Sequence, residues 1–177
     1  DDFIGLQTYT IVRYPKSIFL KLFNAVLLNI GIVRKFILPR IIQIFAGRNG
    51  AITKETRTTK MGYEYRPDAV LYNLKRLNKK FPDKEIFITE NGIATDNDDE
   101  RIEFVTTVLK DVHQFESENS NVIGYLYWSL LDNFEWDLGY QMNFGLVEVD
   151  KETYKRIPHK SAKWFGNISS SNILSIS

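Results

Sequence analysis

The 177-residue sequence predicts an α/β fold in which buried parallel strands alternate with amphipathic helices. Three short runs of apolar, β-branched and aromatic residues have the composition of strands buried on both faces: 3–9, 86–90 and 122–129. Two longer segments between these runs carry apolar residues at helical spacing. This strand–helix–strand order implies right-handed crossovers between parallel neighbours.

The segment 17–47, after the first strand, is rich in Ile, Leu, Phe and Val. Between Phe3 and Lys54 the chain has eight basic residues and no acidic one. The longest uncharged run, Leu22 to Val33, has twelve residues, whereas a membrane-spanning helix needs about 20. We expect two short helices that either pack on the outside of the domain or lie on a membrane surface or over a cleft.

The first helix of the repeating pattern is predicted after Pro67, a residue that suits a first helical turn. Its apolar residues recur at helical spacing, and its last turn is basic, which favours a helix end: Val70, Leu71, Leu74, Leu77, Lys79 and Lys80. The short link 81–84 then leads into the second strand.

The second strand ends in a carboxylate, Glu90, followed at once by Asn91-Gly92. A buried lone carboxylate is costly, so Glu90 is expected where the strand emerges into a cleft, with hydrogen-bond donors around it. Active sites of α/β folds lie at that end of their strands. The alternative is that Glu90 is a plain strand-end charge or a cap for the next helix.

The next helix is predicted from an apolar stripe that starts at Ile102 and ends at Phe115, and the acidic loop 94–100 before it is interpreted as solvated. A short hairpin is expected between 146–150 and 154–157. Pro158 is expected to open a last helix that runs through Phe165, and the Ser- and Asn-rich residues 168–177 are expected to be a disordered tail.

The third strand leads into two tryptophans, Trp128 and Trp136, with Glu135 beside the second. Aromatic faces cover the C–H patches of a pyranose, and carboxylates accept hydrogen bonds from its hydroxyls, so this composition suits a sugar site. The alternative is aromatic packing in the core.

Composition excludes several other kinds of site. The chain has no Cys, which excludes disulfides and thiolate metal sites, and its two histidines, His113 and His159, are too far apart for metal-ligand spacing. We therefore expect no metal and no cofactor. The sequence has no glycine-rich phosphate loop and no nucleic-acid-binding motif. No signal peptide is evident, which favours the cytoplasm, and the start within a strand pattern suggests a piece of a longer protein.

Several motifs, in this order, resemble those of glycoside hydrolase family 1, the β-glucosidase family: Asp2-Phe3-Ile4-Gly5-Leu6-Gln7-Thr8-Tyr9, Ile88-Thr89-Glu90-Asn91-Gly92, Trp128-Ser129-Leu130-Leu131-Asp132-Asn133-Phe134-Glu135-Trp136 and Asn143-Phe144-Gly145-Leu146-Val147. The resemblance implies the C-terminal portion, about strands 6–8, of a (β/α)8 TIM barrel, whose complete form needs about 250 residues. Residues 1–167 would then be a partial barrel domain with a basic apolar insertion at 17–47.

The resemblance also implies a retaining β-glycosidase acting on a β-glucoside or a related sugar without phosphate. Glu90 would be the nucleophile and Tyr9 would orient it, while the remaining site residues would bind sugar: Gln7, Trp128, Glu135, Trp136 and Phe144. Most members carry Asn at the position of Gln7. The family's acid/base glutamate lies in an Asn-Glu-Pro motif, which this chain lacks.

Three functions therefore stay open from the sequence. The chain is part of a β-glucosidase whose N-terminal barrel half is supplied from elsewhere, or an inactive remnant that still binds glycosides, or a membrane-associated module that acts through residues 17–47.

Overall fold

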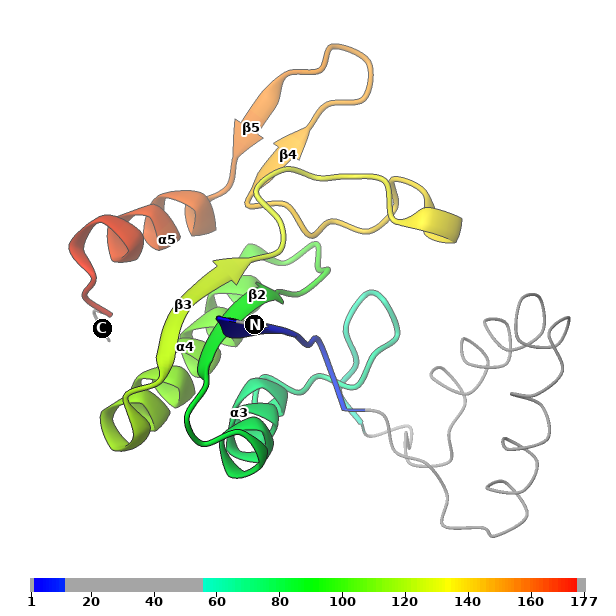
Figure 1. The fold of residues 1–177 in the computed structure, drawn as a ribbon. Coiled ribbons are helices and arrows are strands. Elements are labelled where there is room, and N and C mark those ends of the chain that lie inside the picture. Colours follow the sequence, from blue (N-terminus) through cyan, green and yellow to red (C-terminus); the bar gives the residue numbers. More distant parts are fainter. Residues whose placement is uncertain (1, 12–55, 175–177) are drawn as a thin grey trace, which may run out of the picture.

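The computed structural model describes residues 2–11 and 56–174, which contain a three-stranded parallel sheet, three α-helices and a separate hairpin (Figure 1). The strands follow one another across the sheet in chain order: β1 (Phe3–Gln7), β2 (Glu85–Asn91) and β3 (Val122–Tyr127). They are connected through α3 (Ala69–Lys80) and α4 (Asp98–Asn119). The predicted α/β fold with parallel neighbours is confirmed.

The core lies between β2 and the two connecting helices. Ile86 and Ile88 lie two residues apart on one face of β2, the face that meets the helices, and both are fully buried there. The helices contribute apolar side chains from one face each, namely Val70, Leu74, Phe104, Val105, Val108 and Phe115. This burial keeps β2 at the centre and fixes where its carboxyl end emerges.

Within the described residues, β1 and β3 each pair with β2 alone, so each leaves one edge of the sheet open. The predicted segment 17–47 lies outside the described residues. Among the helices that the structure describes, none has the length and apolar character needed to cross a membrane.

The hairpin after the sheet was predicted in nearly its observed position, with β4 (Val147–Val149) antiparallel to β5 (Arg156–Pro158). Pro158 pairs with Val147 in this hairpin and does not open the last helix. That helix, α5, begins two residues later and covers Lys160–Ser171.

The prediction of a disordered tail from residue 168 is also wrong for the residues that α5 includes. Three serine hydroxyls in the last turn donate to carbonyl groups one turn earlier: Ser169 to Phe165, Ser170 to Gly166 and Ser171 to Asn167. The helix therefore extends to Ser171, through a stretch whose composition is typical of a loop, and its serine hydroxyls bond within the helix.

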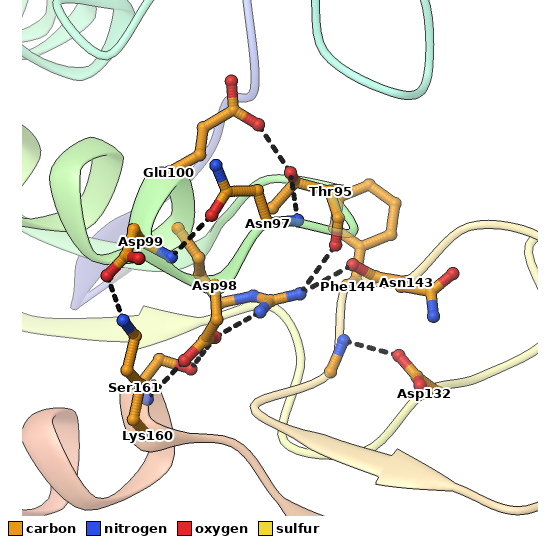
Figure 2. Close-up of polar contacts among 12 residues, drawn as sticks. Thr95, Asn97, Asp98, Asp99, Glu100, Asp132, Asn143, Phe144, Lys160 and Ser161 are labelled. Atoms are coloured by element: carbon orange, nitrogen blue, oxygen red, sulfur yellow. Dashed lines mark hydrogen bonds and ion pairs between the residues drawn. The ribbon is translucent and has the colours of Figure 1, made fainter.

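The N-termini of α4 and α5 are joined by one carboxylate, that of Asp98 (Figure 2). The N-cap residue of α5, His159, makes no side-chain capping bond. Asp98 takes that role, because its carboxylate accepts from the backbone N–H of Ser161 at 2.8 Å and from the Ser161 hydroxyl at 2.6 Å. It also pairs with the guanidinium of Arg101 at 2.5 Å. The sequence had suggested that the acidic residues 94–100 are only solvated, and for Asp98, the first residue of α4, this is wrong.

The pKa of Asp98 lies below its usual value. Burial raises this pKa, but the hydrogen bonds from Ser161 and the ion pair with Arg101 outweigh burial. A carboxyl whose pKa is depressed by folding stabilises the native state at a pH above its ordinary pKa of 3.8. That contribution is lost as the pH falls through the lower, folded value.

We therefore predict that Asp98→Asn lowers the free energy of unfolding at pH 7 by about 3 kcal/mol, because the buried Arg101 loses its counter-charge. Urea unfolding at pH 7 and at about pH 3 measures this. The difference between wild type and variant should shrink at the lower pH, where Asp98 begins to be protonated. An unchanged difference would contradict the assignment. Asp99→Asn is the control, since Asp99 is exposed and pairs with the exposed Lys160, and we expect less than about 1 kcal/mol.

Candidate active site

Glu90 lies at the carboxyl end of the central strand, next to Gln7 in the register between β2 and β1. Both oxygens of its carboxylate accept hydrogen bonds from the end of β1. The Gln7 amide donates to Oε1 at 2.8 Å, and the Tyr9 hydroxyl donates to Oε2 at 2.9 Å. The predicted donors around Glu90 are therefore present, and they fix the orientation of the carboxylate.

The residue after Glu90, Asn91, is buried and holds the three strand ends together. Its side-chain amide donates to the carbonyl of Thr8 at 2.7 Å, and its carbonyl oxygen accepts from the Tyr125 hydroxyl at 2.9 Å. These bonds tie β2 to the chain after β1 on one side and to β3 on the other. Both the nitrogen and the oxygen of this buried amide therefore have a hydrogen-bond partner beside Glu90.

Tyr9 is a neutral hydrogen-bond donor in this structure. Burial raises its pKa well above the usual range for tyrosine, and the hydrogen bond to Glu90 and the charges of Glu90 and Glu135 raise it further. Its ring meets the ring of Phe144 edge to face, with 5.9 Å between the centroids. Phe144, itself buried, therefore covers one side of the Tyr9–Glu90 pair.

Trp128 and Glu135 face each other where β3 ends, since the indole N–H of Trp128 donates to Glu135 Oε1 at 3.3 Å. Trp136 begins the short 3-10 helix η2 (Trp136–Leu138), and 83% of its surface is exposed. The two tryptophans thus differ. Trp128 is partly buried and hydrogen-bonded, whereas Trp136 offers a free ring face to solvent.

One cavity of about 160 Å³ lies among these side chains, and eight residues line it: Tyr9, Met61, Tyr63, Glu90, Trp128, Glu135, Trp136 and Phe144. Two of them, Met61 and Tyr63, were not predicted from the sequence. The volume is below that of sites for drug-sized ligands, about 300–1,000 Å³. Gln7 does not line the cavity and reaches it only through Glu90. The arrangement presents two carboxylates and several aromatic faces to a ligand about the size of a single ring.

Met61 and Tyr63 come from the turn between Thr58 and Glu64, which form an isolated antiparallel bridge. Gly62 lies at the tip of this turn with φ of +75°. Burial raises the pKa of Tyr63, and the charge of Glu135 raises it further, which places this ring beside the acidic part of the cavity. The sequence had predicted only the helix that follows this turn, after Pro67. The signal that could have predicted a turn here is Gly62 between two large side chains, Met61 and Tyr63.

Among residues 2–11 and 56–174, no group of three or more His, Asp or Glu side chains is arranged to hold a metal ion.

Comparisons with known proteins give this cavity a context. The model of glycosyl hydrolase family 1 matches residues 2–173. Among curated relatives, a protein named putative β-glucosidase 15 from rice (Oryza sativa subsp. japonica) is 34% identical over 174 residues, which cover 93% of this chain and 45% of the relative.

Solved structures agree with this match. A β-glycosidase from Pyrococcus horikoshii superposes with a TM-score of 0.73 at 34% identity, covering 99% of this chain and 36% of that one. A β-glucosidase from Thermotoga maritima, in complex with deoxynojirimycin, superposes with a TM-score of 0.66 at 34% identity, covering 70% and 30%. The chain thus spans less than half the length of these relatives, and its sheet is an incomplete portion of a (β/α)8 barrel.

The position of Trp128 depends on Gly92, where a Cβ atom would lie 1.9 Å from the Trp128 carbonyl oxygen. We predict that Gly92→Ala forces the ends of β2 and β3 apart and costs about 3 kcal/mol of stability. Urea unfolding and tryptophan near-ultraviolet circular dichroism measure the two effects.

Gly166→Ala is the matched control, because a Cβ atom there meets nothing within 4 Å. Alanine in the interior of α5 should leave the tryptophan signal unchanged and add up to about 1 kcal/mol of stability. A Gly92→Ala chain as stable as wild type would show that the approach of the two backbones is not required.

Proposed function

The chain belongs to glycosyl hydrolase family 1, and from this premise we propose that it carries the nucleophile side of a retaining β-glycosidase site. The observation that supports this most is the Glu90 carboxylate, held at the end of the central strand by Gln7 and Tyr9 and open to an aromatic cavity. A nucleophilic carboxylate must be oriented before it can attack, and this one has a donor on each oxygen.

In the proposed reaction a Glu90 oxygen attacks the anomeric carbon of a β-glycoside. The bond from that carbon to the leaving oxygen breaks, and the leaving oxygen takes a proton from a general acid. The product is an ester between the sugar and Glu90. Water then attacks the same carbon, gives its proton to the base left by the first step, and releases the sugar with its original configuration.

The general acid is proposed to come from a part of the barrel beyond these 177 residues, because the sequence has no Asn-Glu-Pro motif. Glu135 is a poor substitute, since it already accepts from the Trp128 indole. We assign Glu135 to the sugar hydroxyls, Trp128 and the exposed Trp136 to the sugar faces, and Phe144 to the wall behind Tyr9. The substrate is proposed to be a β-linked glucose or galactose without phosphate.

The alternative is a binding remnant that holds glycosides without reacting. The two proposals differ in one observable, which is covalent attachment of a sugar to Glu90. A substrate with an activated leaving group separates them, because it needs little help from an acid.

We predict that the chain gains the mass of one fluorosugar when it is incubated with a 2-deoxy-2-fluoro-β-glucoside carrying a dinitrophenolate leaving group. Intact-mass spectrometry measures the gain, and peptide mapping should place it on Glu90. Glu90→Gln should abolish the gain. Glu148→Gln, on the exposed side of β4, makes the same chemical change away from the cavity and should leave labelling unchanged.

A folded wild-type chain that binds the glycoside without gaining mass would favour the binding remnant. A chain that neither binds nor reacts would mean that these residues do not form a working pocket by themselves. Offering the 6-phosphorylated analogue in parallel tests the proposed preference for a sugar without phosphate.

Tyr9 supplies the second prediction from this proposal. Tyr9→Phe removes one of the two donors to Glu90 and should slow labelling by about tenfold or more, because a hydrogen bond to a charged group contributes about 1.5–3 kcal/mol. Tyr72→Phe, at an exposed position of α3, is the control. Equal labelling rates in Tyr9→Phe and wild type would show that Tyr9 only packs.

A further inference from the structure

Arg101 is the largest fully buried side chain among the described residues, with 1% of its surface exposed, yet it lies on α4 outside the cavity. Its guanidinium uses all three nitrogens. Nη1 pairs with Asp98, Nε donates to the Tyr127 hydroxyl at 3.2 Å, and Nη2 donates to the carbonyls of Thr95 at 3.1 Å and Asn143 at 3.0 Å. A planar fork suits this set of acceptors, which a lysine could not reach together.

Arg101 is connected to the backbone of the loop 143–145 in two ways. The first is direct, on the carbonyl of Asn143. The second passes through Tyr127, whose hydroxyl accepts from Arg101 and donates to the carbonyl of Phe144 at 2.9 Å. Burial raises the pKa of Tyr127 to about 12, against the lowering effect of the Arg101 charge, so the phenol keeps the proton that it donates.

Other hydrogen bonds hold this loop as well, and the Lys60 ammonium donates to the side-chain Oδ1 of Asn143 at 2.9 Å. The Gly145 N–H donates to Asp132 Oδ1 at 2.9 Å, and the Asn143 carbonyl also accepts from the Thr95 N–H at 3.2 Å. The Phe144 carbonyl accepts from the backbone N–H of Ser129 at 3.4 Å. Of these groups, Arg101 is the only charged one that contacts a backbone carbonyl of the loop.

The loop matters because it carries Phe144, whose ring contacts the ring of Tyr9 edge to face, and the Tyr9 hydroxyl donates to Glu90. A connected path of contacts therefore runs from the guanidinium, through two backbone carbonyls and one ring, to the donor that orients the carboxylate. Every contact on it is within hydrogen-bond or ring-contact distance.

We propose that Arg101 is a positioning residue for the cavity: its guanidinium fixes the backbone at 143–144 and thereby holds Phe144 against the Tyr9–Glu90 pair. This inference rests on the proposed function where it concerns the rate of reaction at Glu90. The position of Phe144 over Tyr9 can be tested without any sugar.

The first test follows Tyr9 directly. The chain is labelled with 3-fluorotyrosine, whose ring fluorine lowers the phenol pKa, and the fluorine resonances are assigned with tyrosine-to-phenylalanine variants and followed by NMR as the pH rises. In the wild type the Tyr9 resonance should titrate last among the cavity and surface tyrosines, because the ring is partly buried against Phe144, its hydroxyl donates to Glu90, and the charges of Glu90 and Glu135 lie near it.

In Arg101→Lys the charge stays but the fork is lost. Phe144 is then free to move away, Tyr9 loses part of its burial, and the Tyr9 titration should shift to lower pH. Arg66→Lys is the matched control, because Arg66 makes a similar fork to Asp68 at 2.8 and 2.6 Å and lines no part of the cavity. An unmoved Tyr9 titration in folded Arg101→Lys overturns the proposal.

If Arg101 only stabilises the fold, the result is different. Arg101→Lys then lowers the fraction of folded chain but leaves the Tyr9 titration of the folded fraction unchanged. Should Arg101→Lys fail to fold, Tyr127→Phe removes the relay to Phe144 while keeping the Arg101–Asp98 pair. The Tyr9 titration should then move in the same direction by a smaller amount, and no movement counts against the proposal.

The second test uses the labelling reaction and separates the two roles by kinetics. Positioning predicts that Arg101→Lys reacts to one sugar per chain with a first-order rate constant about tenfold lower. Destabilisation alone predicts fewer sugars per chain at an unchanged rate constant. In a Phe144→Leu background, Arg101→Lys should cause no further slowing, because both changes act on one contact. If the wild type does not react at all, the proposed function fails, and the Tyr9 titration still decides the role of Arg101.

Discussion

Two buried or partly buried charges, one on either side of the connection from β2 to α4, determine how the described residues are arranged. A charge removed from water must be matched by hydrogen bonds and counter-charges, because its desolvation is otherwise prohibitive. Glu90 meets this requirement with the end of β1, and Arg101 meets it with Asp98, Tyr127 and the loop at 143. Segments far apart in the sequence therefore meet at this connection. Glu90 contacts a segment more than 80 residues earlier, at the end of β1, and Arg101 contacts the loop at 143, about 40 residues later.

The sequence was informative wherever local pattern and burial agree. The apolar run that ends in Glu90 specified both a central strand and the place of its charge, because a parallel strand buried on both faces can expose a carboxylate only at its end. It was less informative where tertiary contacts decide. Pro158 looked like a helix start, but antiparallel pairing with Val147 keeps it in a strand. The turn that brings Met61 and Tyr63 to the cavity is indicated in the sequence only by the glycine between these two large side chains.

Arg101 shows a signal that periodicity did contain. Counting back from Val108 and Val105 at helical spacing places residue 101 on the buried face of α4, where an arginine calls for partners. The acidic run just before it supplied one, Asp98, although such runs usually only face solvent. The roles proposed for the cavity residues came from the family resemblance. The structure adds their geometry, including the contact of Gln7 with Glu90, which keeps the amide out of the cavity.

The open edges of the sheet have a consequence for how the chain behaves in solution. Within the described residues, β1 and β3 each present a row of backbone N–H and C=O groups that no neighbouring strand takes up, and Ile123 and Leu126 on β3 are about half exposed. Such edges recruit other strands, so copies of this chain can associate through them as the concentration rises. Colloidal stability, more than the free energy of unfolding, would then set the concentration at which the cavity can be studied. Charged or proline substitutions on the outer edge of β3 are the natural means of raising that limit.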